Sequence, residues 1–202
     1  MATQKTKKKI EKPVIIVVEG LDYLHFLRSQ IAGKPEFSTI QLWDFSADGS
    51  FADHLQLLKD ERDFDDLVKT VGVIRDAEYD GPALELSTRD ALLKKNFPVP
   101  DSPNVPARGT PNTGYLIIPH DESVGCLEHA CLKASTLPPA QLACADTFLA
   151  CVSLHHPKPL NRNHQAKLLV HATIAGSGRN PALTLGESAF AGLWDFNHPS
   201  LK

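Results

Sequence analysis

The most informative stretch of the chain is VIIVVEGLDY, residues 14–23. Five consecutive β-branched apolar residues occupy positions 14–18, and such a run is typical of a strand buried on both faces of a parallel sheet. Glu19, Gly20 and Asp22 follow directly, and they allow two interpretations. In one, Asp22 caps a helix over residues 23–31 after an ordinary strand-to-helix turn. In the other, Glu19 belongs to a metal-binding acidic site that is completed further along the chain.

Apolar runs and helical periodicities alternate outward from this stretch. Further strands are predicted over residues 38–46, 71–76 and 115–119, because each combines β-branched or aromatic residues over a short length. Between them the spacing of apolar residues predicts helices, one beginning after Ser50 and one over 87–96, capped by Ser87 or Thr88. Beyond residue 119 the chain is predicted to be mostly helical, over 124–135, 138–154 and 163–175. The sequence therefore predicts an α/β fold, a mainly parallel four-stranded sheet flanked by helices, with a helical C-terminal part.

Residues 97–114 break this alternation, because they hold five of the fifteen prolines. Proline fixes the backbone and removes a hydrogen-bond donor, so this segment is predicted to be a loop. Two alternatives stay open for it: an ordered surface loop, or a mobile flap over a site.

Composition limits the range of partners. The chain has 202 residues, which suits one domain, and its formal net charge of -3 gives no overall attraction to nucleic acid. The basic run KTKKKIEK, residues 5–12, predicts a disordered tail over 1–12, ahead of a single domain over 13–202. Apolar runs are too short to span a bilayer, so no membrane partner is expected.

The four cysteines lack C-x-x-C spacing and fall in apolar helical segments, which predicts reduced core thiols and a cytoplasmic protein. They are Cys126, Cys131, Cys144 and Cys151.

Acidic residues follow several of the predicted strands. Glu19 ends the first strand, and Asp76 and Glu78 leave the third, where an extended exit would turn both carboxylates to one side. Carboxyl ends of parallel strands meet at one edge of the sheet, and Glu128, on the next predicted helix, is a further contributor. Carboxylates that meet there repel one another unless a divalent cation lies between them, and oxygen ligands suit Mg²⁺ or Mn²⁺. The alternative is that these acids cap helices and keep the surface soluble.

Two of these stretches, VVEGLDYLHFL and VGVIRDAEYDG, resemble the Toprim domain of topoisomerases, primases and the overcoming-lysogenization-defect nucleases. The later GYLIIPHDESVGCLEHACL and HQAKLLVHATIA are similar to an uncharacterised bacterial family of Toprim-like, nuclease-related proteins. The resemblance implies a Toprim/Rossmann-like sheet, with Glu19 binding metal or acting as a general acid/base, and Asp76 and Glu78 binding Mg²⁺. It also makes a separate ATPase subunit a candidate partner. Two positions depart from the family pattern: Glu78 where an aspartate is usual, and Tyr23 where many relatives carry an acid.

The favoured hypothesis is a Mg²⁺- or Mn²⁺-dependent phosphoryl-transfer or nuclease-like protein acting on nucleic acid. Glu19 and Lys167 are the candidate catalytic residues, and Asp76, Glu78 and Glu128 are the candidate metal ligands. Arg162 and His164 are candidate phosphate contacts. The alternative is a catalytically inactive Toprim-like binding or regulatory module. A third hypothesis treats the acids as surface residues of an interaction protein.

Overall fold

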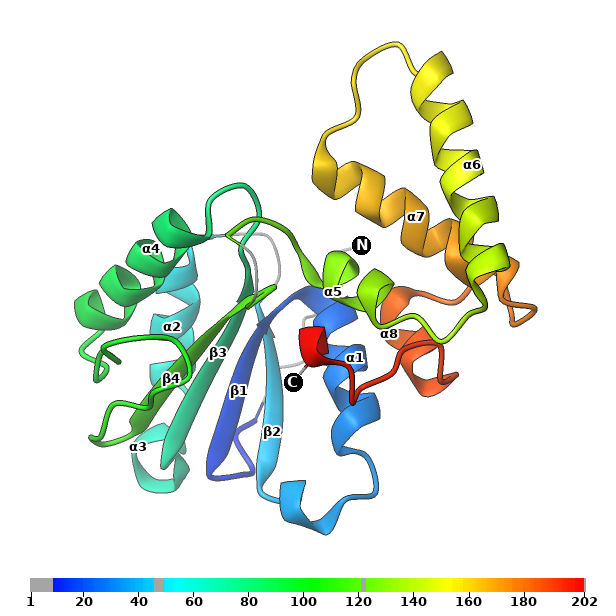
Figure 1. Cartoon of the computed structure of the whole chain (residues 1–202). Helices are drawn as coiled ribbons and strands as arrows, with labels where there is room; N and C mark the ends of the chain where they lie inside the picture. Colours follow the sequence, from blue (N-terminus) through cyan, green and yellow to red (C-terminus); the bar gives the residue numbers. More distant parts are fainter. Residues whose placement is uncertain (1–8, 46–48, 121–122, 202) are drawn as a thin grey trace, which may run out of the picture.

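A computed structural model describes residues 9–45, 49–120 and 123–201. Four parallel strands form one sheet in the order β2-β1-β3-β4, which confirms the predicted α/β fold with its four-stranded parallel sheet flanked by helices. The strands are β1 (Val14–Glu19), β2 (Ile40–Phe45), β3 (Thr70–Asp76) and β4 (Asn112–Ile118). Their carboxyl ends meet at one edge of the sheet, its upper end to the left of α5 in Figure 1.

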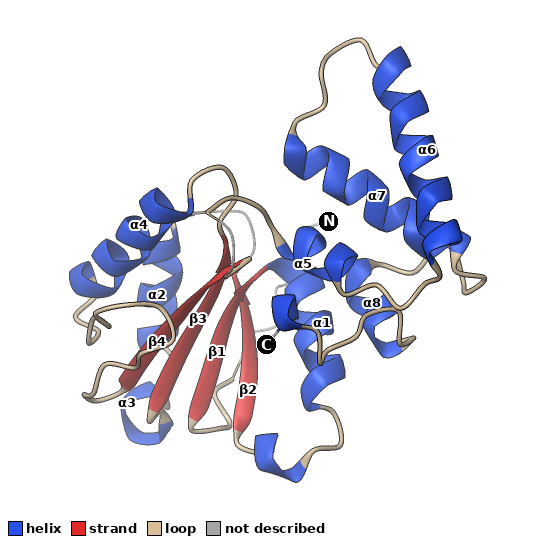
Figure 2. Ribbon diagram, viewed as in Figure 1, coloured by secondary structure: helices blue, strands red, loops and turns tan. Residues whose placement is uncertain are grey.

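Helices cover both faces of the sheet, as Figure 2 shows. The first face carries α2 (Phe51–Lys59), α3 (Phe64–Leu67) and α4 (Gly81–Lys94). The second carries α1 (Gly20–Ile31), α5 (Leu127–Lys133), α7 (Arg162–Gly176) and α8 (Leu185–Phe190). A long helix, α6 (Pro139–His155), pairs with α7 and projects away from the sheet, and short 3-10 turns span Pro35–Phe37 and Pro199–Leu201.

The apolar run at residues 14–18 is explained by this layering. Ile15 and Val17 belong to the core beneath α2, α3 and α4, whereas Val18 belongs to the core beneath α1 and α8. Successive strand residues point to opposite faces, so a strand covered on both sides has to be apolar throughout. The run therefore fixes β1 at the centre of the molecule.

Several predicted boundaries differ from the structure. Asp22 does not cap α1, because that helix begins at Gly20 with Glu19 at the N-cap position. Ser50 caps α2 as predicted, through a hydrogen bond from the Asp53 backbone. The helix predicted over 87–96 begins earlier, at Gly81, where the side chain of Asp80 accepts a hydrogen bond from the backbone of Ala83. Neither Ser87 nor Thr88 is its cap.

The N-terminal prediction is wrong for residues 9–12, while residues 1–8 lie outside the described residues. Ile10 is 2% exposed and packs in the core of the first face. Two hydrogen bonds to the Gln41 side chain hold Lys9 and Glu11 against β2. The folded unit therefore extends to residue 9 at least.

Two of the four cysteines also differ from expectation. Cys126 and Cys131 are buried, but Cys144 and Cys151 are exposed on α6. α6 is apolar around most of its circumference, so its sequence pattern does not distinguish the side that packs on α7 from the side that faces solvent. Across the described ranges, no helix combines the length and the apolar character needed to cross a membrane.

Candidate functional site

Asp76, the last residue of β3, lies at the centre of the acidic edge. Its Oδ1 accepts hydrogen bonds from the Tyr23 hydroxyl of α1 and, at 2.8 Å, from the backbone N–H of Leu127 at the start of α5. Tyr23 itself is buried, with 3% of its surface exposed. The Oδ1 atom of Asp76 is thus held by α1 and by α5, two helices that are distant in sequence. The position of Asp76 is therefore fixed by the fold.

The environment of Asp76 disfavours its ionised form. Burial raises the pKa of Asp76 to about 8, and the charges of Glu128 and Glu78 act in the same direction. The hydrogen bonds from Tyr23 and Leu127 act in the opposite direction but do not compensate. The ionised carboxylate of Asp76 is thus destabilised by burial and by the neighbouring acids, and an added cation would stabilise it.

Glu19 leaves β1 at the same edge. It occupies the N-cap position of α1 without capping it, and its carboxylate is 42% exposed and lies 3.7 Å from the Nε of Arg75. The Arg75 guanidinium stacks 4.7 Å from the ring centre of Phe51, and burial lowers its pKa although Glu19 acts to raise it. Glu19 therefore already has one cationic partner.

A small cavity of about 140 Å³ brings the predicted residues together. Glu19 enters its wall from β1, Asp76 from β3 and Glu128 from α5, while Lys167 enters from α7. Burial acts to lower the pKa of Lys167, yet the charges of Glu128, Cys126, Glu78 and Asp76 outweigh it and raise the pKa. Four of the five predicted catalytic and metal-binding residues therefore line one cavity.

Glu78 is the exception. The extended exit predicted for Asp76 and Glu78 is wrong, because Glu78 has a φ of 52° and its backbone pairs with Gly125. Its side chain accepts a 2.5 Å hydrogen bond from Asn163, on the first turn of α7. Glu78 is thus bonded to α7 and helps to hold that helix, and it is not among the residues that line the cavity.

Other candidates lie outside the cavity wall. Arg162 and His164 are exposed on the first turn of α7. The proline-rich loop runs beside β4 on the far side of the sheet, where Ala107 pairs with Thr113, and it lines a different cavity through Pro103 and Asn104. This arrangement favours an ordered surface loop over a flap across the acids.

Sequence reasoning missed Asn163 and Arg75, which hold Glu78 and Glu19. An uncharged amide inside a helix and an arginine inside a strand carry no functional signal of their own.

Within residues 9–45, 49–120 and 123–201, no three His, Cys, Asp or Glu side chains converge in an arrangement that could hold a metal ion.

A family model described as "Protein of unknown function (DUF3226)" matches residues 13–202. No curated protein and no solved structure matches the chain.

Proposed function

We propose that in this chain, which belongs to the DUF3226 family, the carboxyl edge of the sheet is a divalent-cation-dependent phosphoryl-transfer or nuclease-like site for nucleic acid. One observation carries the proposal: carboxylates from three separate elements, those of Glu19, Asp76 and Glu128, line a single cavity together with Lys167. Scattered surface acids would have no reason to meet in this way.

The donor chemistry fits Mg²⁺ or Mn²⁺. All three carboxylates offer oxygen ligands, which these ions prefer, and the raised pKa of Asp76 reflects repulsion and burial that a cation would offset. When bound, such an ion would supply charge neutralisation on a scissile phosphate. The proposed ligands are Asp76 and Glu128, and because no three such side chains of the described ranges already converge, binding of the ion would require these side chains to move.

The chain's own groups have distinct roles in this proposal. Lys167 faces the acids from α7 and would contact a phosphate oxygen entering between α7 and the sheet edge. The exposed carboxylate of Glu19 is the group best placed to accept or give a proton. Tyr23 and the Leu127 backbone position Asp76, while Asn163 and Glu78 tie α7 to the end of β3.

A cleavage assay tests this proposal. The full chain is incubated with Mn²⁺ or Mg²⁺ and with single-stranded DNA, double-stranded DNA or RNA in parallel. Cleavage of one of these substrates should require the divalent ion and fall at least about 100-fold in Glu19→Gln and Lys167→Ala. Asp101→Asn is the matched control, because Asp101 is exposed in the proline-rich loop, and it should cleave normally. Unchanged cleavage in Glu19→Gln would contradict the proposal.

A second candidate is a Toprim-like module that binds without catalysis. The ion pair between Glu19 and Arg75 and the hydrogen bond between Glu78 and Asn163 favour it, because both acids are already satisfied by protein groups. Binding of Mn²⁺ without cleavage of any of the three nucleic acids would select this candidate.

A further inference from the structure

A second cavity, of about 400 Å³, lies at the same edge of the sheet as the acidic one. Its wall includes Ile117 near the end of β4, Pro119 just after that strand, and Pro82 in the first turn of α4. Ile118 of β4 is the register partner of Asp76, which lines the acidic cavity from β3. Neighbouring strands lie about 4.8 Å apart, so the two cavities are built on adjacent strand ends.

The chain passes from one cavity to the other through a short turn. Asp76 lines the acidic cavity, and Gly81 lines the second one. Between them, the backbones of Glu78 and Gly125 exchange two hydrogen bonds, of 2.6 and 2.8 Å. The N–H of Gly81 then donates to the carbonyl of Ser123 at 2.7 Å. Hydrogen bonds on both sides of residue 79 therefore hold this turn in place.

Tyr79, within this turn, differs from the other two tyrosines of the chain. Tyr23 and Tyr115 are each 3% exposed, and their hydroxyls donate to carboxylates. Tyr79, in contrast, is 63% exposed, so neither burial nor packing accounts for an aromatic ring at this position. An exposed ring on a turn that is already fixed offers a flat apolar surface on which a nucleobase can stack.

The lining of the second cavity suits a nucleobase, which has apolar faces and a polar edge. Pro82, Pro103 and Pro119 provide apolar walls that lose no rotamer freedom when a ligand packs on them. Polar side chains in the same lining can donate to and accept from the edge of a base. They are Glu85, Asn104, His120 and Ser123. The volume also falls within the ~300–1,000 Å³ typical of ligand sites.

We infer that the second cavity binds a nucleobase, that Tyr79 stacks on a neighbouring base, and that the substrate of the carboxyl edge is single-stranded nucleic acid. The inference rests on the proposed function, which assigns the phosphate backbone to the acidic cavity. Bases in a duplex are paired and stacked, so neither the cavity nor Tyr79 could reach them. An unpaired strand exposes its bases to both.

Fluorescence anisotropy tests the stacking role of Tyr79. The full chain is titrated, in Ca²⁺, into a short fluorescein-labelled single-stranded DNA of mixed sequence, and a gel verifies that the strand stays intact. We expect at least about fivefold weaker binding in Tyr79→Ala and parent-like binding in Tyr79→Phe, because stacking needs the ring and not the hydroxyl. Phe148→Ala is the matched control and should bind normally. This ring is 46% exposed but lies on α6, which projects away from the sheet.

A second variant tests the cavity. Ser123→Trp adds a large ring to a residue of the lining, and it should weaken binding at least about fivefold by filling the space that a base would occupy. Ser87→Trp is its control, because Ser87 is exposed on α4 and does not line the cavity, and it should bind normally. Far-UV circular dichroism establishes that each variant is folded.

Two further ligands identify the binding mode. A strand of abasic nucleotides and a blunt hairpin duplex should each bind at least tenfold more weakly than the single strand, since neither presents free bases. Equal binding of the abasic strand or of the duplex would overturn the inference. Unchanged binding in either Tyr79→Ala or Ser123→Trp, or failure of the parent chain to bind the single strand, would overturn it as well.

Binding and cleavage are measured separately, so the inference and the proposed activity can fail separately. Base-dependent binding without cleavage in Mn²⁺ or Mg²⁺ would remove the activity and leave the single-strand site. Metal-dependent cleavage with no effect of Tyr79→Ala and Ser123→Trp on binding would remove that site and leave the activity.

Discussion

Asp76 ends a buried parallel strand, where burial and, after it, the charges of Glu128 and Glu78 raise its pKa. Tyr23 occupies the position where the Toprim resemblance leads one to expect an acid, and its hydroxyl donates to Asp76. An acid at position 23 would add a fourth negative charge beside Asp76, Glu128 and Glu78, whereas tyrosine supplies a hydrogen-bond donor. A tyrosine at this position therefore positions Asp76 without adding to the repulsion.

The pKa of Asp76 predicts how stability depends on pH. The folded-state pKa of about 8 exceeds the unfolded value near 4, so the folded chain binds the extra proton between these values. The contribution of Asp76 to the free energy of unfolding should therefore be largest below pH 4 and fall by several kcal/mol as pH rises to 8. In Asp76→Asn this contribution should disappear. Urea denaturation in chelator at pH 5 and pH 8 measures it, and an equal decrease in both proteins would contradict the assignment.

Only part of the candidate site could be predicted from the sequence. Glu19, Asp76 and Glu128 were predictable because strand ends and helix starts converge at one edge of a parallel sheet. The left-handed backbone of Glu78 was not, because it depends on pairing with Gly125, far along the chain. Local sequence cannot encode such a partner.

At the scale of elements, the strands were predicted closely and the helix starts less well. A strand buried on both faces shows as an unbroken apolar run, whereas α4 begins with the polar and proline-containing turn that follows Asp80. The turn from β1 into α1 is set by Gly20, with a φ of 86°. Glycine adopts this conformation without the steric cost that other residues incur.

Gly20→Ala tests the contribution of that turn. No atom lies within 4 Å of the added Cβ, so the cost should be conformational alone, about 1–2 kcal/mol in the free energy of unfolding. Gly176→Ala, at the end of α7, is the control, because its surroundings are also open and its φ is not positive. It should be neutral or slightly stabilising. Equal effects of the two substitutions in chemical denaturation would contradict this explanation.

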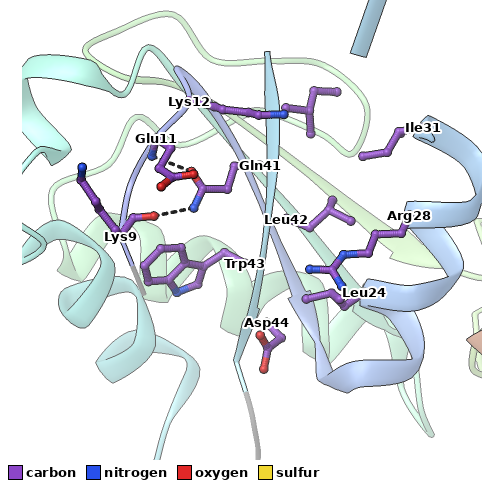
Figure 3. Close-up of a pocket in the computed structure, with 11 residues that line it drawn as sticks. Lys9, Glu11, Lys12, Leu24, Arg28, Ile31, Gln41, Leu42, Trp43 and Asp44 are labelled. Atoms are coloured by element: carbon purple, nitrogen blue, oxygen red, sulfur yellow. Dashed lines mark hydrogen bonds between the residues drawn. The ribbon is translucent and has the colours of Figure 1, made fainter. Parts of the chain in front are cut away.

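At the scale of the whole molecule, the sheet separates three surfaces. The acidic cavity lies at the carboxyl edge, a larger cavity lies along β2 (Figure 3), and the proline-rich loop lies beside β4. The segment ahead of β1 contributes to one of these surfaces. The run of lysines in this segment predicted a disordered tail. No feature of the sequence indicated that Ile10, within that run, anchors residues 9–12 in the core.

Ile10→Ala measures that anchoring. Ile10 is 2% exposed in the main core, so its truncation should reduce the free energy of unfolding by about 2–4 kcal/mol. Val105→Ala, at a position that is 53% exposed, should have little effect. Chemical denaturation that finds both variants as stable as the parent chain would contradict the packing of residues 9–12.

Calorimetric titration of Mn²⁺ into the chelator-treated full chain at pH 8 tests most directly whether the carboxylates share a divalent ion. We predict one bound ion per chain, at least tenfold weaker binding in Asp76→Asn and in Glu128→Gln, and unchanged binding in Asp101→Asn. Failure of the parent chain to bind Mn²⁺ at millimolar concentration, or equal affinity in Asp76→Asn, would contradict the account.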